Sequence, residues 1–227
     1  MAAGSLRLIA ASLLPWVQQR QTFGAPIGSR ELVQRRLGGR AARIVACDAL
    51  TAWTAQLLDQ GYRGELECVT AKVFGSEAVK EATVDVLLKT HGGRALLAGN
   101  LFTEALWDLL APTVYEGENE ILTLGYFRTL ARRAQLATVM LVVSRYADRQ
   151  SDPWVRQAGV CAALELGARL TGAPPTGEIY HWVTELGRAV AEEQFPVGRD
   201  AERGAVVMAE PLTGENACAE TSSGPEA

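Results

Sequence analysis

The chain has 227 residues, of which 48% are apolar and 21% are charged, so it is long enough to bury a core as one or two domains. Its formal net charge of -4 gives no general attraction for nucleic acid or an anionic membrane. The sequence contains no apolar run of about 18 residues, so no transmembrane span is predicted. Four widely spaced cysteines and only two histidines predict neither a metal centre nor a disulfide scaffold. Reduced thiols in a cytoplasmic protein are the simplest interpretation.

The amino-terminal segment has two possible interpretations. Residues 2–30 contain no acid and three arginines among Ala, Ser and Leu, a composition shared with organelle transit peptides. Leu6, Ile9, Leu13 and Val17, however, recur at helical spacing and predict an amphipathic helix from about Gly4 to Gln21. We favour a buried helix, because the segment runs without a break into a motif at residues 20–27.

Long helices are predicted next. Thr22 to Gly28, with two glycines and a proline, predicts a connection, after which Ser29 is a candidate N-cap for a helix that ends at Gly61. A third helix is predicted from Leu66 to Thr90, where His91-Gly92-Gly93 stops it. A short helical pattern follows at Leu101–Leu110, and a long one runs from Asn119 to about Arg149, with Ala134 as a candidate break.

Two more helices are predicted near the carboxyl end. Asp152 before Pro153 is an N-cap pattern for a helix to Thr171, and another helix begins near Thr176. Strand-like alternation is nearly absent, so the predicted fold is all-α: an antiparallel helical bundle with an additional carboxyl-terminal helical hairpin. The predicted division is a bundle at 1–134, a helical extension packed on it at 135–210, and a disordered tail at 211–227.

Three segments carry a resemblance to a known family. Residues 20–27 read RQTFGAPI, residues 91–93 read HGG, and residues 114–121 read VYEGENEI. In this order they resemble the R-x-x-F-G-x-P-I, Gly-Gly and Y-E-G-T-N-E-I segments of the carboxyl-terminal helical domain of the acyl-CoA dehydrogenases. The resemblance covers roughly residues 4–133 and does not extend to that family's amino-terminal helical domain or middle β-domain.

The resemblance implies a flavin-dependent α,β-desaturation of an acyl thioester. Glu116 would be the base that removes the α-proton, and Tyr115 and Gly117 would contact the substrate. A carboxylate beside a flavin and an acyl chain is poorly solvated, which favours proton uptake. The alternative is that Glu116 is a carboxylate near a helix N-terminus, stabilised there by the helix dipole.

The cofactor implied by the resemblance is FAD, and no metal is implied. Arg20 would reach the diphosphate of a flavin held mainly by a neighbouring subunit, and Phe23 would pack on its adenine side. Alternatives are a surface salt bridge for Arg20 and a core position for Phe23. By position, the remaining cofactor-binding candidates are Thr22, Glu31, Lys89, Gly92, Gly93, Glu118 and Asn119.

Some candidates depart from the family pattern. Glu31 replaces a glutamine, which puts a negative charge near a diphosphate, whereas Lys89 replaces a glutamine with a cation that can pair with phosphate. Trp107-Asp108 replaces an R-D pair. Glu118 replaces a threonine, as in the E-G-D-N segment of acyl-CoA oxidases. These departures bear on flavin affinity more than on the base.

Two hypotheses about function follow. In the first, the chain is a partial subunit of an FAD-dependent acyl-CoA dehydrogenase-like oxidoreductase, acts on a thioester of CoA or of a carrier protein, and needs a homo- or hetero-oligomeric partner that bears the β-domain. In the second, it is a non-catalytic interaction or scaffold subunit with Glu116 idle. A third possibility is that the remaining domains are encoded upstream. The acyl chain, the carrier and the electron acceptor are not fixed by these residues.

Overall fold

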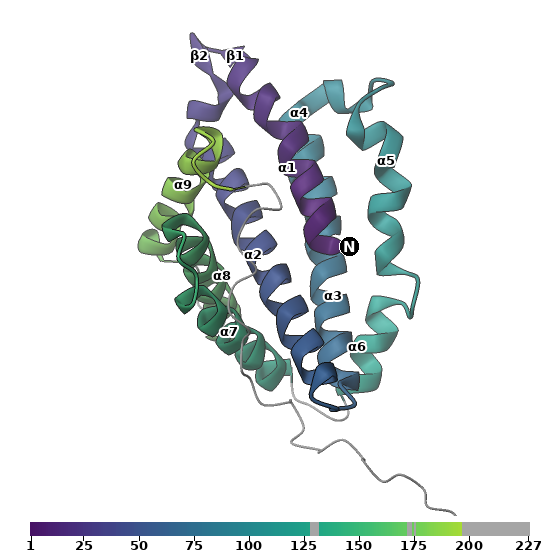
Figure 1. Cartoon of the computed structure of the whole chain (residues 1–227). Coiled ribbons are helices and arrows are strands. Elements are labelled where there is room, and N and C mark those ends of the chain that lie inside the picture. Colours follow the sequence, from purple (N-terminus) through teal and green to yellow (C-terminus); the bar gives the residue numbers. More distant parts are fainter. Residues whose placement is uncertain (128–131, 172–173, 175, 197–227) are drawn as a thin grey trace, which may run out of the picture.

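The computed structural model describes residues 1–127, 132–171, 174 and 176–196, and within these the fold is a bundle of helices (Figure 1). Consecutive long helices run in opposite directions, because short turns join them. The all-α antiparallel architecture expected from the sequence is confirmed. The helices are α1 (Ala2–Gln19), α2 (Glu31–Asp59), α3 (Glu65–Glu81), α4 (Lys89–His91), α5 (Leu101–Leu110), α6 (Asn119–Phe127), α7 (Arg132–Asp148), α8 (Pro153–Thr171) and α9 (Gly177–Ala191).

The amino-terminal segment is a core helix. Leu6, Ile9, Leu13 and Val17 of α1 are fully buried, as their spacing predicts, and α1 packs against α2 and α3. Arg7 on the same helix forms an ion pair with Asp48 of α2. The interpretation of this segment as a buried helix is therefore confirmed. None of the described helices is long and apolar enough to cross a membrane.

The connection between α1 and α2 contains a small β-ribbon that the sequence did not predict. Strands β1 (Gln21–Thr22) and β2 (Ala25–Pro26) pair antiparallel around Phe23 and Gly24, which both have positive φ. Two-residue strands are too short for alternation to be visible in the sequence. The N-cap prediction for Ser29 was wrong, since Arg30 is the capping position and the Ser29 hydroxyl donates to the Pro26 carbonyl at 2.7 Å.

The third helix changes its winding before it ends. After α3 the chain forms a π-helical segment, η2 (Ala82–Leu88), and then α4, so the helix predicted from Leu66 to Thr90 is continuous in space but not uniform. A 3-10 segment, η3 (Gly92–Leu96), begins with the two glycines and leads to α5. Asn100 caps α5 by accepting a hydrogen bond from the Phe102 amide at 3.0 Å.

The last helices share a core with the first ones. Asp152 caps α8 as predicted, accepting hydrogen bonds from the amides of Trp154 and Val155 at 2.8 and 3.0 Å. Both α8 and α9 pack along α2, and α8 also packs on α7, so one apolar cluster extends from α1 to α9. The division of the chain at residues 134 and 135 stays a prediction, and the predicted tail at 211–227 lies outside the described residues.

Candidate functional site

Glu116 lies on a strained turn between η4 (Ala111–Thr113) and α6. Its φ is 59° and that of Gly117 is 99°, and the left-handed region costs a non-glycine residue about 1 kcal/mol or more. A Cβ at position 117 would lie 2.8 Å from the Leu122 side chain, so glycine is required there for space as well as for backbone conformation. The Glu116 side chain is exposed. Backbone strain that the surrounding structure maintains is typical of functional sites.

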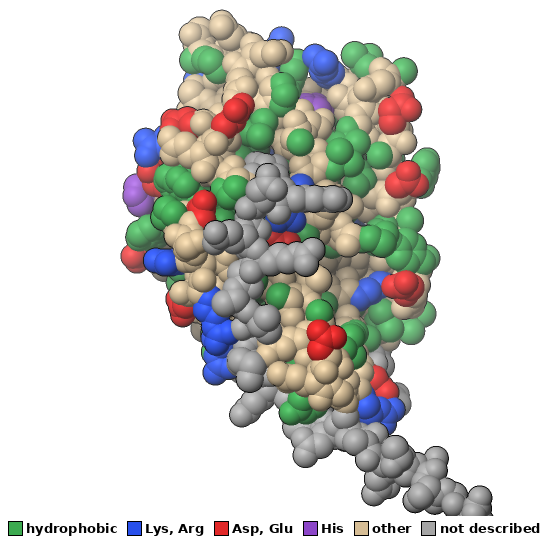
Figure 2. All heavy atoms as spheres, viewed as in Figure 1, with side chains coloured by type: hydrophobic (Ala, Val, Ile, Leu, Met, Phe, Trp, Pro, Cys, Tyr) green, Lys and Arg blue, Asp and Glu red, His purple; other side chains and the backbone are tan. Residues whose placement is uncertain are grey.

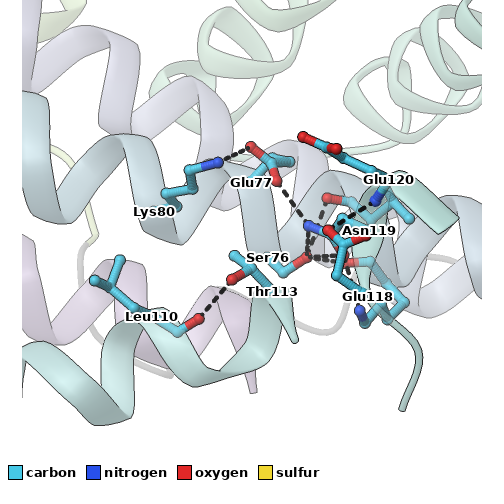
Figure 3. A network of polar contacts seen from close by, with 10 residues as sticks. Ser76, Glu77, Lys80, Leu110, Thr113, Glu118, Asn119 and Glu120 are labelled. Atoms are coloured by element: carbon cyan, nitrogen blue, oxygen red, sulfur yellow. Dashed lines mark hydrogen bonds and ion pairs between the residues drawn. The ribbon is translucent and has the colours of Figure 1, made fainter. Parts of the chain in front are cut away.

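A polar network on α3 holds this turn (Figure 3). Lys72 donates to the Gly117 carbonyl and, at 2.8 Å, to Oδ1 of the buried Asn119. Asn119 Nδ2 donates to Glu77 Oε1 at 2.7 Å and to the Ser76 hydroxyl at 2.9 Å. Both ends of the Asn119 amide are thus engaged inside the protein, and the residue anchors the Glu116 turn to α3. A cofactor contact by Asn119 stays a prediction.

Glu118 caps the helix that follows the turn. Its carboxylate accepts hydrogen bonds from the amides of Glu120 at 2.9 Å and Ile121 at 3.0 Å. These two backbone hydrogen bonds lower the pKa of Glu118. The acid that replaces the family's threonine therefore has a local structural role as the N-terminal cap of α6.

A cavity of about 570 Å³ lies behind the turn, between α3, α6 and α7. Asn119 and Glu120 line it and Glu116 does not, so this cavity is not where a base at position 116 would act. Its other described lining residues are Thr70, Val73, Phe74, Glu77, Lys80, Thr123, Leu124, Leu136 and Val139.

The outer surface beside Glu116 is rich in exposed apolar side chains. We call this the α5–α6 face, and it comprises Trp107, Val114, Tyr115 and Ile121. Trp107, at the position of the family's arginine, is 80% exposed. In Figure 2 hydrophobic side chains gather along the edge of the molecule formed by α5 and α6. Clustered apolar exposure of this kind marks a surface that another protein or domain covers.

The other group of candidates lies at the opposite end of the bundle, around the β1–β2 ribbon (Figure 1). Phe23 at the ribbon tip is 97% exposed, with the Arg30 guanidinium carbon 5.6 Å from its ring centroid, so it is not a core aromatic. Arg20 is exposed at the end of α1 and lies over the Trp16 ring, and no salt bridge to it occurs among the described residues. The Thr22 carbonyl accepts a hydrogen bond from Arg30.

The Gly-Gly turn lies at the same end as Arg20. Trp16 Nε1 donates to the Thr90 carbonyl at 3.0 Å, and the Trp16 and His91 rings pack edge to face with centroids 5.9 Å apart. Gly92 has φ 64° and ψ -144°, a conformation open almost only to glycine, and no atom lies within 4 Å of a Cβ built at Gly92 or Gly93. The backbone here is open to a ligand.

The two charged candidates that depart from the family pattern have partners on their own helices. Lys89 forms an ion pair with Asp85, and Glu31 accepts a hydrogen bond from Arg35 at 2.7 Å. Both pairs are exposed and span one helical turn. Asp85 and Arg35 therefore partly offset the charges of Lys89 and Glu31, which reduces both the expected attraction of Lys89 for a diphosphate and the expected repulsion by Glu31.

The structure thus separates the predicted site residues into two groups. Tyr115 to Asn119, before and at the start of α6, form one. The other lies around the β1–β2 ribbon and α4 at the opposite end of the bundle in Figure 1, and comprises Arg20, Thr22, Phe23, Glu31, Lys89, Gly92 and Gly93. Sequence reasoning missed the supporting residues Lys72, Ser76 and Glu77, and also Trp16 and Arg94. Lys72 and Ser76 share one face of α3 at a spacing of four, but such spacing is also typical of a solvated helix face.

The fold and the glutamate turn define the class of protein as an all-α helical domain of acyl-CoA dehydrogenase type. The family model described as "Acyl-CoA dehydrogenase, C-terminal domain" matches residues 1–135. The chain belongs to this family.

Individual relatives match over about half of the chain. It is 27% identical over 122 residues to a cyclohexane-1-carbonyl-CoA dehydrogenase of Geobacter metallireducens (54% of this chain, 32% of the relative). It is 30% identical over 124 residues to an acyl-CoA dehydrogenase of Bacillus subtilis (53% of this chain, 32% of the relative). A solved acyl-CoA dehydrogenase of Bacillus anthracis, complexed with FAD, aligns with a TM-score of 0.49 and 20% identity over 85% of this chain and 40% of that chain. The chain spans about a third of the length of the curated relatives.

Proposed function

We propose that the chain supplies the catalytic base, Glu116, to a flavin-dependent α,β-desaturation of an acyl thioester, and that a partner bearing the β-domain completes the site. The observation that carries the proposal is the turn itself. An acid is fixed at positive φ, braced by Lys72 and Asn119, at the border of an exposed apolar face. Such strain is concentrated at functional sites, which makes this exposed acid a candidate for one.

Covering the α5–α6 face would give Glu116 the environment that a base requires. In water a carboxylate is well solvated and a weak base, and removal of that water by an apolar partner and an acyl chain strengthens it. Tyr115, half exposed next to Glu116, would line the same pocket. The main-chain N–H of Glu116 would point at the thioester oxygen and stabilise the enolate that forms as the α-proton leaves.

FAD is the proposed cofactor, and it would accept the β-hydrogen as hydride. The segment before α6, which carries Glu116, and the β1–β2 ribbon, which Arg20 precedes, lie at opposite ends of the bundle in Figure 1, so we propose that the two residues serve two different flavins, in an oligomer held together with the partner. Arg20 would bind the diphosphate and Phe23, with its exposed ring, would pack on the adenine. We place this oligomer in the cytoplasm, and the carrier of the acyl group is CoA or a carrier protein.

The second candidate is a scaffold subunit without chemistry. The observation that favours it is that Glu116 is exposed and does not line the cavity of about 570 Å³, while the α5–α6 face alone would suffice to bind a partner. In that case the purified assembly would be colourless and would stay so after FAD is added.

The test uses the full chain purified together with its bound partner. Glu116→Gln is compared with Glu120→Gln, an exposed glutamate one turn further along. Flavin absorbance is measured first, and then desaturation of a straight-chain saturated acyl-CoA with an artificial electron acceptor. We expect Glu116→Gln to keep its flavin and lose activity by about a hundredfold or more, with Glu120→Gln unaffected. Full activity in Glu116→Gln would show that another group is the base.

A further inference from the structure

The cavity between α3, α6 and α7 has mostly apolar walls. Val73 and Phe74 line it from α3, Leu124 from α6, and Leu136 and Val139 from α7. Because α7 packs mainly on α2 and α8 rather than on α3, a space is left between α3 and α7. The cavity of about 570 Å³ lies within the range of small-molecule sites, roughly 300 to 1,000 Å³, and is therefore large enough to hold a ligand.

The wall on α3 is held in place by contacts within the protein. The guanidinium carbon of the buried Arg43 lies 5.6 Å from the centroid of the Phe74 ring, which fixes this ring by a cation–π contact. Glu77 accepts hydrogen bonds from Asn119 at 2.7 Å and from Lys80 at 3.3 Å (Figure 3). A wall whose side chains are already ordered loses little conformational freedom when a ligand binds.

The charges around the cavity disfavour anions. The charged residues of the described lining are Glu77, Glu120 and Lys80, which are two acids and one base. Lys80 already forms an ion pair with Glu77, so the described wall offers an anionic ligand no unpaired cation. Thr123 adds an uncharged hydroxyl group, which can donate and accept hydrogen bonds. These walls fit a neutral, mainly apolar molecule better than a fatty acid, a coenzyme A thioester or a flavin nucleotide.

We propose that this cavity binds an uncharged aliphatic molecule with one small polar end, such as a medium-chain alcohol, and that the bound molecule stabilises the Glu116 turn. The link is Asn119, which lines the cavity and is held by Glu77. Its side chain also accepts a hydrogen bond from Lys72, which donates to the Gly117 carbonyl as well. A ligand that excludes water from this wall strengthens these hydrogen bonds. The regulatory part rests on the proposed function, whereas the binding part does not.

The binding test is calorimetric titration of the full chain with 1-octanol and, as a matched anion, octanoate. We expect octanol to bind at least about tenfold more tightly, because the carboxylate of octanoate meets two acids and no unpaired cation in the described wall. Val73→Phe and Leu136→Phe each add a ring to the cavity, one from α3 and one from α7. Each should weaken octanol binding by about tenfold or more. Trp107→Glu alters the α5–α6 face instead and should leave octanol binding unchanged.

Amide hydrogen exchange tests the link to the turn. Saturating octanol should slow exchange across residues 117–122 by about threefold or more in the unchanged chain, because the brace on Asn119 opens less often. The same concentration of octanol should have no such effect in Val73→Phe. Circular dichroism verifies that each variant is folded.

Four results would overturn the inference: no measurable octanol binding, octanoate binding as tight as that of octanol, full octanol affinity in both wall variants, or loss of octanol binding in Trp107→Glu, which would assign the alcohol to the α5–α6 face. Octanol binding without slower exchange would refute the link to the turn. These measurements need neither flavin nor thioester, and Glu116→Gln should bind octanol as the unchanged chain does. A failure of the proposed chemistry is therefore distinguishable from a failure of this site.

Discussion

At the scale of single residues, the clearest polar feature outside the candidate site is the pair of buried arginines on α2. Arg40 and Arg43 contact the two oxygens of Glu81, at 3.2 and 3.5 Å, and Arg43 also contacts Glu165 of α8 at 3.5 Å. Burial alone would raise the pKa of Glu81, but the two guanidinium groups outweigh it and lower that pKa below its ordinary value. This cluster connects α2, α3 and α8 electrostatically.

Replacing Glu81 with Gln should therefore reduce stability in a pH-dependent way. At neutral pH we expect a loss of about 1 to 3 kcal/mol in the free energy of unfolding, less than for a fully buried pair because the Glu81 side chain is 41% exposed. The folded-state pKa lies below the unfolded one, so the stabilisation is present above the unfolded pKa of about 4.3 and is lost as the pH falls through the folded value.

Urea unfolding at pH 7 and at several lower values measures the effect, with Glu65→Gln, which removes an exposed carboxylate, as the control. The stability difference between the unchanged chain and Glu81→Gln should shrink as the pH falls below 4, whereas Glu65→Gln should differ little throughout. A difference that does not change with pH would contradict the assignment to this carboxylate.

At the scale of elements, the contact between α2 and α9 depends on two glycines. A Cβ at Gly38 would lie 2.0 Å from the Val183 carbonyl oxygen, and a Cβ at Gly187 would lie 1.7 Å from that of Gln34. The helices therefore approach each other backbone to backbone at this crossing. Glycine has a low helix propensity, so Gly38 and Gly39 weaken α2 locally. The close contact with α9 explains why Gly38 is needed despite that cost.

Gly38→Ala should loosen the packing of α9, and Gly39→Ala is its matched control. No atom lies within 4 Å of a Cβ built at Gly39, so that change should be neutral or stabilise the chain by up to about 1 kcal/mol through helix propensity. Gly38→Ala should cost about 2 kcal/mol or more, because the new methyl group overlaps main-chain atoms that cannot move separately. Thermal unfolding and limited proteolysis of α9 measure the two variants. Equal stability of both variants would show that α2 and α9 are not in close contact in solution.

The sequence predicted the elements well where periodicity and caps were strong. Buried positions of α1, the Asp152 cap and the Gly-Gly stop were all read from local patterns. The β1–β2 ribbon and the crossing at Gly38 were not, because neither leaves a periodic signal within one segment. The same distinction holds at the candidate site: motif order located Glu116 and Gly117, whereas the brace from Lys72 and Ser76 comes from a helix more than 40 residues earlier in the chain and depends on tertiary packing.

At the scale of the whole molecule, the α5–α6 face is the surface most in need of a partner. It exposes apolar side chains that a monomer normally buries or disperses. Burial of that face against a partner would also remove water from around the Glu116 carboxylate. We therefore expect the isolated chain to self-associate through this face.

Trp107→Glu should reduce that association without unfolding the chain. Trp107 is 80% exposed and contributes little to the core, so a charge there disfavours burial of the face while leaving the bundle intact. Leu164→Glu, at an exposed position on α8 away from this face, is the control. Sedimentation equilibrium and binding of a hydrophobic dye should show self-association of the unchanged chain and of Leu164→Glu, and a dissociation constant at least about tenfold higher for Trp107→Glu. A monomeric chain that binds no dye would show that the face is stable in water. The argument for a partner, and for a covered pocket around Glu116, would then fail.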